Sequence, residues 1–189
     1  MEKLRQEIRR LVFTRAYQKR KVTLASGRES DFYVDCRQVT LTSEGVYKLA
    51  SYILQLIRKE GLQAKAVGGP AMGAVPLATA VSTLSWGASS GEPLDTFFVR
   101  SEPKKHGLEN RVDGPTLREG LPILVLDDVL TTGGSILKTV RATRQLGCKV
   151  ERIIVIVDRQ EGGKENLQKE GLPVSAILTR DELVKYGAN

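Results

Sequence analysis

Apolar positions recur at helical spacing in two segments of the first third of the chain. One stripe runs from Leu4 to Val12, and a second runs from Val46 to Ile57 and stops before Gly61. Each stripe predicts an amphipathic helix. Between them, strand-like pieces flank Ser26-Gly27, so a strand-turn-strand unit is expected over residues 21–37.

Beyond residue 60, short apolar runs alternate with helical patterns. The strand-like runs are AKAVGGP, which is expected to lead into a Gly-Gly-Pro turn, and DTFFVR, PILVLDD, ERIIVIVDR and VSAIL. The helical patterns are MGAVPLATAVSTLS, with Pro76 in its first turn, then residues 135–146, and GKENLQKEG. Strands that are apolar on both faces are typical of a mainly parallel sheet flanked by helices, so we expect an α/β fold.

Ligands of such sheets bind beyond the carboxyl ends of the strands. Gly69, Arg100, Asp128 and Arg159 each stand just past the expected end of a strand. We therefore expect the functional site at that edge. Residues 101–114 are polar and predict a long loop, a kind of segment that is usually functional or mobile.

Composition indicates one folded domain over residues 1–189. Hydrophobic residues make up 41% and charged residues 27%, which is typical of a globular chain. No apolar run approaches the roughly 20 residues that span a bilayer, and the charged N-terminus lacks the profile of a secretory signal. Cys36 and Cys148 have no metal-ligand spacing and are expected to be buried thiols. We expect a cytoplasmic protein with no membrane partner.

The formal net charge of +7 is concentrated at the N-terminus. Residues 1–21 carry eight Lys or Arg against Glu2 and Glu7, whereas the rest of the chain is nearly neutral. A basic chain is a candidate for nucleic-acid binding, but no aromatic series accompanies these charges. The pattern favours a solvated helix face, or one that meets an acidic partner, and no nucleic-acid partner is expected.

The segment ILVLDDVLTTGGS carries the strongest chemical signal. The residues that join its buried strand to a helix N-terminus are Thr131, Thr132, Gly133, Gly134 and Ser135. Free N–H groups, hydroxyls and the helix dipole attract an anion at such a junction. No Lys follows the glycines and no GxGxxG is present, which excludes a Walker P-loop. The pattern predicts a phosphate cradle, although a Gly-rich turn in which Ser135 is an ordinary helix N-cap would have the same sequence pattern.

Asp127 and Asp128 precede this cradle, although adjacent carboxylates repel each other. A phosphate in the cradle would place an attached sugar within their reach. Carboxylates accept hydrogen bonds from vicinal hydroxyls and attract Mg²⁺ directly or through water. Because a 5-phosphoribosyl group combines a phosphate with a 2′,3′-diol, we interpret the pair as a diol site that also attracts Mg²⁺.

The run VLDDVLTTGGS resembles the signature of the type I phosphoribosyltransferases for 5-phosphoribosyl 1-diphosphate (PRPP). Three further segments resemble the orotate phosphoribosyltransferases of that family. They are LASGRESDFYVDCR (24–37), similar to a strand-turn-strand unit, VRSEPKKHGLENRVDG (99–114), similar to a mobile catalytic loop, and VDRQEGG (157–163), similar to a segment whose arginine receives the orotate carboxylate. The resemblance spans approximately residues 3–185 and implies a type I fold, with a small N-terminal hood over about 1–40 and a core over about 41–189.

The resemblance also implies a reaction and its residues. The reaction is transfer of the 5-phosphoribosyl group from PRPP to N1 of orotate, with Mg²⁺ brought by PRPP, in the synthesis of UMP by a homodimer that shares its mobile loop. Lys104, His106 and Asp128 are implied to be catalytic, and Thr131 and Arg159 to bind orotate. The implied PRPP-binding residues are Gly69, Arg100, Lys104, His106, Asp127, Asp128, Val129, Leu130, Thr131, Thr132, Gly133, Gly134 and Ser135. Direct metal ligands are not expected, although Asp127 and Asp128 are candidates through water.

The charges of the loop at 101–114 and of the adjoining Arg100 support the same function on chemical grounds. A cationic lid that carries Arg100, Lys104 and His106 suits a diphosphate leaving group, whose charge grows as the glycosidic bond breaks. Where certain bacterial relatives have Lys, however, this chain has Ala25, Gly73 and Ser101, each of which removes a cation from the site. Arg28 and Lys105 are candidates to compensate.

Two other functions remain open on the sequence. A PRPP-responsive regulator of the same fold that binds RNA or DNA would account for the basic first helix, but it would need neither the cationic loop nor Arg159. A transferase acting on a purine or another base would not need Arg159 either, because orotate, unlike uracil and the purines, carries a carboxylate that a guanidinium binds with two parallel hydrogen bonds.

Overall fold

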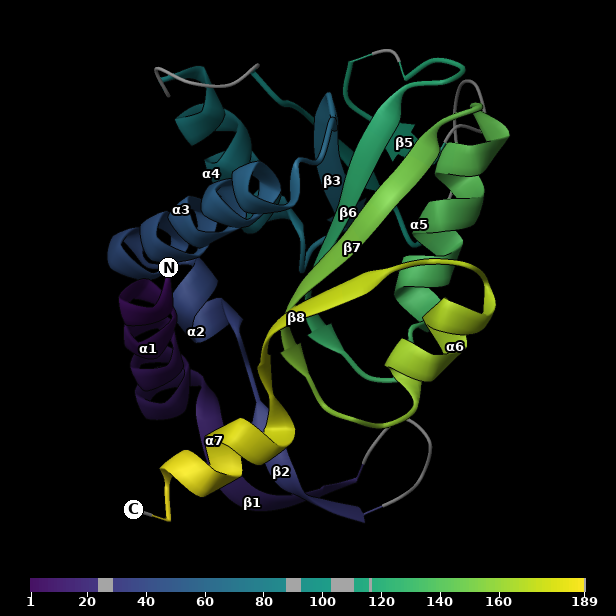
Figure 1. The fold of residues 1–189 in the computed structure, drawn as a ribbon. Coiled ribbons are helices and arrows are strands. Elements are labelled where there is room, and N and C mark those ends of the chain that lie inside the picture. Colours follow the sequence, from purple (N-terminus) through teal and green to yellow (C-terminus); the bar gives the residue numbers. More distant parts are fainter. Residues whose placement is uncertain (24–28, 88–92, 103–110, 116, 189) are drawn as a thin grey trace.

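The computed structural model describes residues 1–23, 29–87, 93–102, 111–115 and 117–188, and its centre is a six-stranded sheet (Figure 1). The strands are β3 (Ala66–Pro70), β4 (Asp95–Val99), β5 (Val112–Asp113), β6 (Pro122–Leu130), β7 (Lys149–Asp158) and β8 (Val174–Thr179). Their order is β5-β4-β3-β6-β7-β8, and every pairing is parallel except β4 with β5. The expected mainly parallel sheet is confirmed.

Helices cover both faces of this sheet. Helices α3 (Ser43–Glu60) and α4 (Val75–Trp86) lie on one face, and α5 (Gly134–Gln145) and α6 (Gly163–Lys169) on the other (Figure 1). Successive residues of a strand point to opposite faces: Leu124 packs in the apolar cluster that holds the α3 and α4 residues, whereas Ile123 packs in the cluster of α5. This two-sided burial explains why β6 is apolar at consecutive positions. None of the described helices is both long and apolar enough to cross a membrane.

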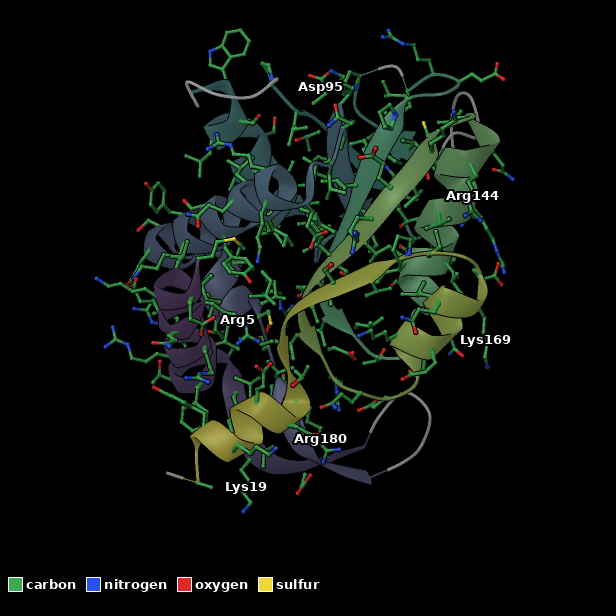
Figure 2. All side chains as sticks on the ribbon, viewed as in Figure 1. Arg5, Lys19, Asp95, Arg144, Lys169 and Arg180 are labelled. Atoms are coloured by element: carbon green, nitrogen blue, oxygen red, sulfur yellow. The ribbon has the colours of Figure 1, made fainter. Side chains whose placement is uncertain are left out.

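The first forty residues, which we call the hood, form a separate layer. They contain α1 (Glu2–Leu11), the short π-helix η1 (Val12–Ala16), the antiparallel strands β1 (Tyr17–Thr23) and β2 (Glu29–Val34), and α2 (Arg37–Thr40). The C-terminal helix α7 (Arg180–Tyr186) lies beside β2, where Arg180, labelled in Figure 2, pairs with Asp31 at 3.0 Å. Ile8 and Phe32 of the hood belong to the same apolar cluster as Leu126 of β6. The hood and one face of the sheet thus share a core.

Several expected boundaries move. Pro70 ends β3 rather than opening a turn, and the turn follows at residues 71–74. Strand β6 continues through the acidic pair to Leu130, because its pairing with β7 continues there. Gly69 and Asp128 therefore lie inside strands near their carboxyl ends, and the prediction that they stand past those ends is wrong. Arg100 and Arg159 do follow their strands, as predicted.

Three further features were not predicted. Helices α2 and α7 are too short to show an apolar stripe. The polar stretch 101–114 contains strand β5, while residues 103–110 of that stretch, with Lys104 and His106, lie outside the described residues. The predicted turn at Ser26-Gly27, the departure at Ala25 and the two candidates to compensate, Arg28 and Lys105, also lie outside them.

Gly68 and Gly69 of β3 are required by close packing. A Cβ atom on Gly68 would lie 2.0 Å from the carbonyl oxygen of Phe97, and one on Gly69 would lie 1.9 Å from that of Leu126. Real Cβ atoms do not approach that closely, so only glycine lets β3 fit against its neighbours in this way. The glycine pair therefore has a packing role, whatever it binds.

We expect Gly69→Ala to lower the free energy of unfolding by at least about 2 kcal/mol, because the added methyl group overlaps backbone of a paired strand. The measurement is urea denaturation followed by circular dichroism. Gly87→Ala is the matched control, since the φ of Gly87 is −81° and its Cβ would meet no atom of the described residues within 4 Å. Equal stability of the two variants would contradict this account of β3.

Candidate active site

Asp127 and Asp128 lie together near the end of β6, and Asp127 is only 5% exposed. Its Oδ2 accepts a 3.1 Å hydrogen bond from Ser135 Oγ, and its Oδ1 accepts one of 3.0 Å from the backbone N–H of Asp128. The Oδ1 of Asp128 accepts a 2.8 Å bond from the backbone N–H of Val129. These bonds hold both carboxylates against the strand and against the first turn of α5.

Burial raises the pKa of Asp127 to about 7, and the negative charge of Asp128 adds to the rise. The backbone N–H of Asp128 and the hydroxyl of Ser135 act in the opposite direction, since both donate to the carboxylate. A carboxylate kept in such an environment costs stability in its ionised form. Perturbed carboxylates of this kind concentrate at functional sites, which supports a binding role for the pair.

The predicted cradle lies at the junction between β6 and α5. Gly133 has a φ of +86°, which favours glycine, and starts the helix. The N–H groups of the first helical turn have no partner within a helix, and Gly134 and Ser135 are exposed there. The turn is held from outside by Asn166 of α6, whose Nδ2 donates a 3.1 Å hydrogen bond to the Thr132 carbonyl. The structure thus brings exposed backbone donors and the acidic pair together through Ser135.

A cavity of about 380 Å³ opens beside Asp128. Its lining comes from the hood, from the turn after β3 and from the end of β6, and consists of Tyr33, Val34, Asp35, Cys36, Arg37, Met72, Gly73, Asp128 and Val129. A Cβ on Gly73 would lie 2.7 Å from Oδ1 of Asp128 and 2.9 Å from Oδ1 of Asp127. Glycine at this position therefore lets the turn approach both carboxylates, and a side chain here would require the turn or the carboxylates to move.

Arg159 follows β7 and is 7% exposed, so it is a buried cation and not a surface one. Its Nη2 donates a 3.1 Å hydrogen bond to the carbonyl of Phe32 in β2, and its Nε lies 2.9 Å from Oε1 of Glu161. The guanidinium also lies over the Phe32 ring, 5.7 Å from its centroid. These contacts fix the plane of the guanidinium where the hood meets the end of the main sheet.

Two other predicted site residues, Arg100 and Gly69, do not line the cavity beside Asp128. Arg100 is half-exposed and pairs with Asp113 of β5, so binding a phosphate would require it to exchange partners. Gly69 is buried within β3. Asp35 and Arg37, which line the same cavity as Asp128, were not among the predicted site residues. Both belong to the segment 24–37, but only the fold brings that segment close to Asp128.

The raised pKa of Asp127 makes stability depend on pH in a defined direction. Asp127 ionises near its ordinary pKa of 3.8 in the unfolded chain and near about 7 in the folded protein. Between these values the folded state binds the extra proton, so stability falls as the pH rises.

We therefore expect Asp127→Asn to raise Tm above that of the wild type by about 2–6 °C at pH 8, equivalent to roughly 1–2 kcal/mol. The gap should narrow at pH 5, where the wild-type side chain is already protonated in the folded state. Thermal denaturation at the two pH values checks this, with the exposed Asp95→Asn as control. A gap of the same size at both pH values would show that ionisation of Asp127 is not its cause.

Comparison with known proteins agrees with this geometry. The profile of the phosphoribosyl transferase domain matches residues 38–174. An orotate phosphoribosyltransferase of Sorangium cellulosum (strain So ce56) is 42% identical over 181 residues, which cover 95% of this chain and 93% of the relative.

Two crystal structures of Mycobacterium tuberculosis H37Rv orotate phosphoribosyltransferase superpose on nearly the whole chain. The complex with Fe(III) dicitrate has a TM-score of 0.80 at 34% identity and covers 95% of this chain and 98% of that one. The complex with PRPP has a TM-score of 0.77 at 31% identity, and the match covers 96% of this chain and 99% of that one. With its mainly parallel sheet, its acidic pair and this similarity along its length, the chain belongs to the orotate phosphoribosyltransferases of the type I phosphoribosyltransferase family.

Proposed function

We propose that this protein transfers the 5-phosphoribosyl group from PRPP to N1 of orotate, forming orotidine 5′-monophosphate and diphosphate for the synthesis of UMP. The observation that carries the proposal is the junction of β6 and α5, where the Ser135–Asp127 hydrogen bond joins an acidic pair to a helix N-terminus. One ribose 5-phosphate matches both parts. A relative that is 42% identical and named for this activity supports the acceptor, and a similar structure that holds PRPP supports the donor.

The donor would be held at its two ends. The 5-phosphate would accept hydrogen bonds from the N–H groups and hydroxyls of residues 131–135, and the ribose hydroxyls would donate to Asp127 and Asp128. Such donors stabilise the ionised carboxylates and so offset the burial that raises the pKa of Asp127. The carboxylates of Asp127 and Asp128, which repel each other in the free protein, would therefore gain hydrogen-bond donors when the sugar binds.

Mg²⁺ fits this site in the way it usually accompanies phosphorylated substrates, with one or two carboxylates and otherwise substrate oxygens and water. The described residues contain no group of three potential ligands that would form a site of their own. Asp127 and Asp128 are the residues that would hold it, directly or through water. When bound, the ion would screen negative charge on the departing diphosphate.

The protein's share of catalysis is positioning and electrostatic stabilisation. The site would hold PRPP and orotate in line while charge separates at the breaking C–O bond, without a covalent nucleophile. Arg100, together with Lys104 and His106 of the adjoining loop, would stabilise the leaving diphosphate. Gly69 would place the turn that follows β3 beside it. We further propose a cytoplasmic homodimer in which each loop closes over the partner's site.

Orotate would be oriented by its carboxylate. Arg159 is suited to this because the Phe32 carbonyl and Glu161 hold its guanidinium plane in place before the base arrives. A planar carboxylate meets such a group with two parallel hydrogen bonds. Thr131, at the start of the cradle, would contact the base from the side of the ribose.

The proposal is tested by mixing the protein with PRPP, Mg²⁺ and orotate and following the near-ultraviolet absorbance of orotate. We expect the absorbance to fall only when all components are present, because forming the glycosidic bond changes the orotate ring. The same mixture with hypoxanthine or uracil is the control. Turnover with either of those bases, without turnover of orotate, would overturn the assignment of the acceptor.

Arg159→Gln should raise the KM for orotate by about 10- to 100-fold, the cost of losing a hydrogen-bonded charge pair. The KM for PRPP should stay nearly unchanged, because the donor carries no group for this arginine. Arg180→Gln is the matched control, since Arg180 also lies 5.7 Å from the Phe32 ring but pairs with Asp31 outside the site. Steady-state kinetics check both variants, and an equal loss for both substrates would remove Arg159 from this role.

A further inference from the structure

The cavity beside Asp128 contains an arginine to which the proposed mechanism gives no role. Among its lining residues the charged side chains are Asp35, Arg37 and Asp128. Arg37 comes from the hood, at the start of α2, and Asp128 comes from the end of β6. The fold therefore brings a cation from the N-terminal layer to the wall of the cavity that borders the acidic pair.

Arg37 is held at its base and exposed at its tip. The preceding residue, Cys36, is 0% exposed, which anchors the backbone. The guanidinium forms two hydrogen bonds with Asp35, from Nε to Oδ1 at 2.8 Å and from Nη2 to Oδ2 at 3.1 Å. The side chain of Arg37 is nevertheless 63% exposed, whereas that of Asp35 is 17% exposed. Arg37 is therefore the open member of the pair, and Asp35 would keep hydrogen bonds from the backbone N–H of Arg37 and from Nε2 of Gln38 if the guanidinium took another anion.

The electrostatic surroundings of Arg37 extend to the acidic pair. The hydrogen bond and the charge of Asp35 raise the pKa of Arg37, and the charge of Asp128 adds to the rise. A free carboxylate of Asp128 therefore attracts the guanidinium, and ribose hydroxyls or a metal bound at Asp128 would weaken that attraction.

The geometry of the donor indicates which anion that is. A ribose held by its 5-phosphate in the cradle and by its 2′,3′-diol on Asp127 and Asp128 presents C1 on the side away from the cradle. The C1 substituent of PRPP is a diphosphate. The cavity bordered by the turn at Met72 and Gly73 has Asp128, one of the two residues proposed to hold the diol, in its wall, and we expect the C1 substituent to enter it.

We infer that Arg37 is a substrate-binding residue whose guanidinium leaves Asp35 and binds the diphosphate group of the donor in this cavity. The inference rests on the proposed function and adds a cation from the hood to its site. Arginine suits the task because its planar donors match phosphate oxygens in pairs. Asp35 then acts as the partner of Arg37 in the free enzyme.

Two variants separate this role from that of a structural ion pair. Arg37→Gln should raise the KM for PRPP by about tenfold, as expected for loss of one charge-assisted contact, and affect the KM for orotate much less. Asp35→Asn should leave the KM for PRPP unchanged or lower it, because it frees Arg37 and removes a negative charge from the cavity wall. If the pair were only structural, both variants would shift the KM for PRPP in the same direction, and that result would overturn the inference.

Binding of inorganic diphosphate with Mg²⁺, measured by calorimetry on the full chain, tests Arg37 independently of the acceptor. The affinity should fall about tenfold in Arg37→Gln and stay unchanged in the control Arg15→Gln. Arg15 is an exposed arginine of the hood that pairs with Glu44 of α3 at 3.0 Å. If this difference appears while orotate is not turned over, the proposed acceptor fails and the role of Arg37 stands. If orotate is turned over while Arg37→Gln binds diphosphate like the wild type, the proposed function stands and the role of Arg37 fails.

Discussion

The buried carboxylate of Asp127 is the constraint on which the rest of the site depends. A charge at this depth is unfavourable unless donors surround it, and the structure supplies one from the strand and one from Ser135. The second bond ties the end of β6 to the first turn of α5, so the phosphate cradle and the diol site have a fixed spacing. In the proposed complex the ribose hydroxyls would supply the donors that the protein leaves out, which would couple binding of the sugar to relief of the buried charge.

The walls of the site come from distant parts of the chain. Arg159 reaches the Phe32 carbonyl across 127 residues, and the cavity beside Asp128 combines the hood, the turn after β3 and the end of β6. The shared apolar core of the hood and the sheet holds these parts together. A change in the packing of the hood would therefore alter the surroundings of both Arg159, the proposed orotate contact, and the cavity beside Asp128, the proposed diphosphate site.

The basic N-terminus has a structural use that the sequence analysis allowed for. Arg5 pairs with Glu182 of α7 at 2.5 Å, and Arg15 pairs with Glu44 of α3 at 3.0 Å. These contacts join α1 and η1 to later helices through acidic partners in the same chain. Part of the positive charge that makes a basic chain a candidate for nucleic-acid binding is thus neutralised within the fold.

The sequence by itself determined the parallel α/β architecture and the core of the site. Both are local signals: apolar periodicity reports which faces are buried, and the acidic pair and the cradle lie within nine consecutive residues, 127–135, so their proximity needs no knowledge of the fold. Only the tertiary structure decided that Asp127 and Asp128 remain within β6, that Arg159 is buried against Phe32, and that Arg37 and Gly73 line the same cavity as Asp128. These facts depend on strand pairing and on packing between segments far apart in the chain, and no pattern within a short stretch of residues encodes them.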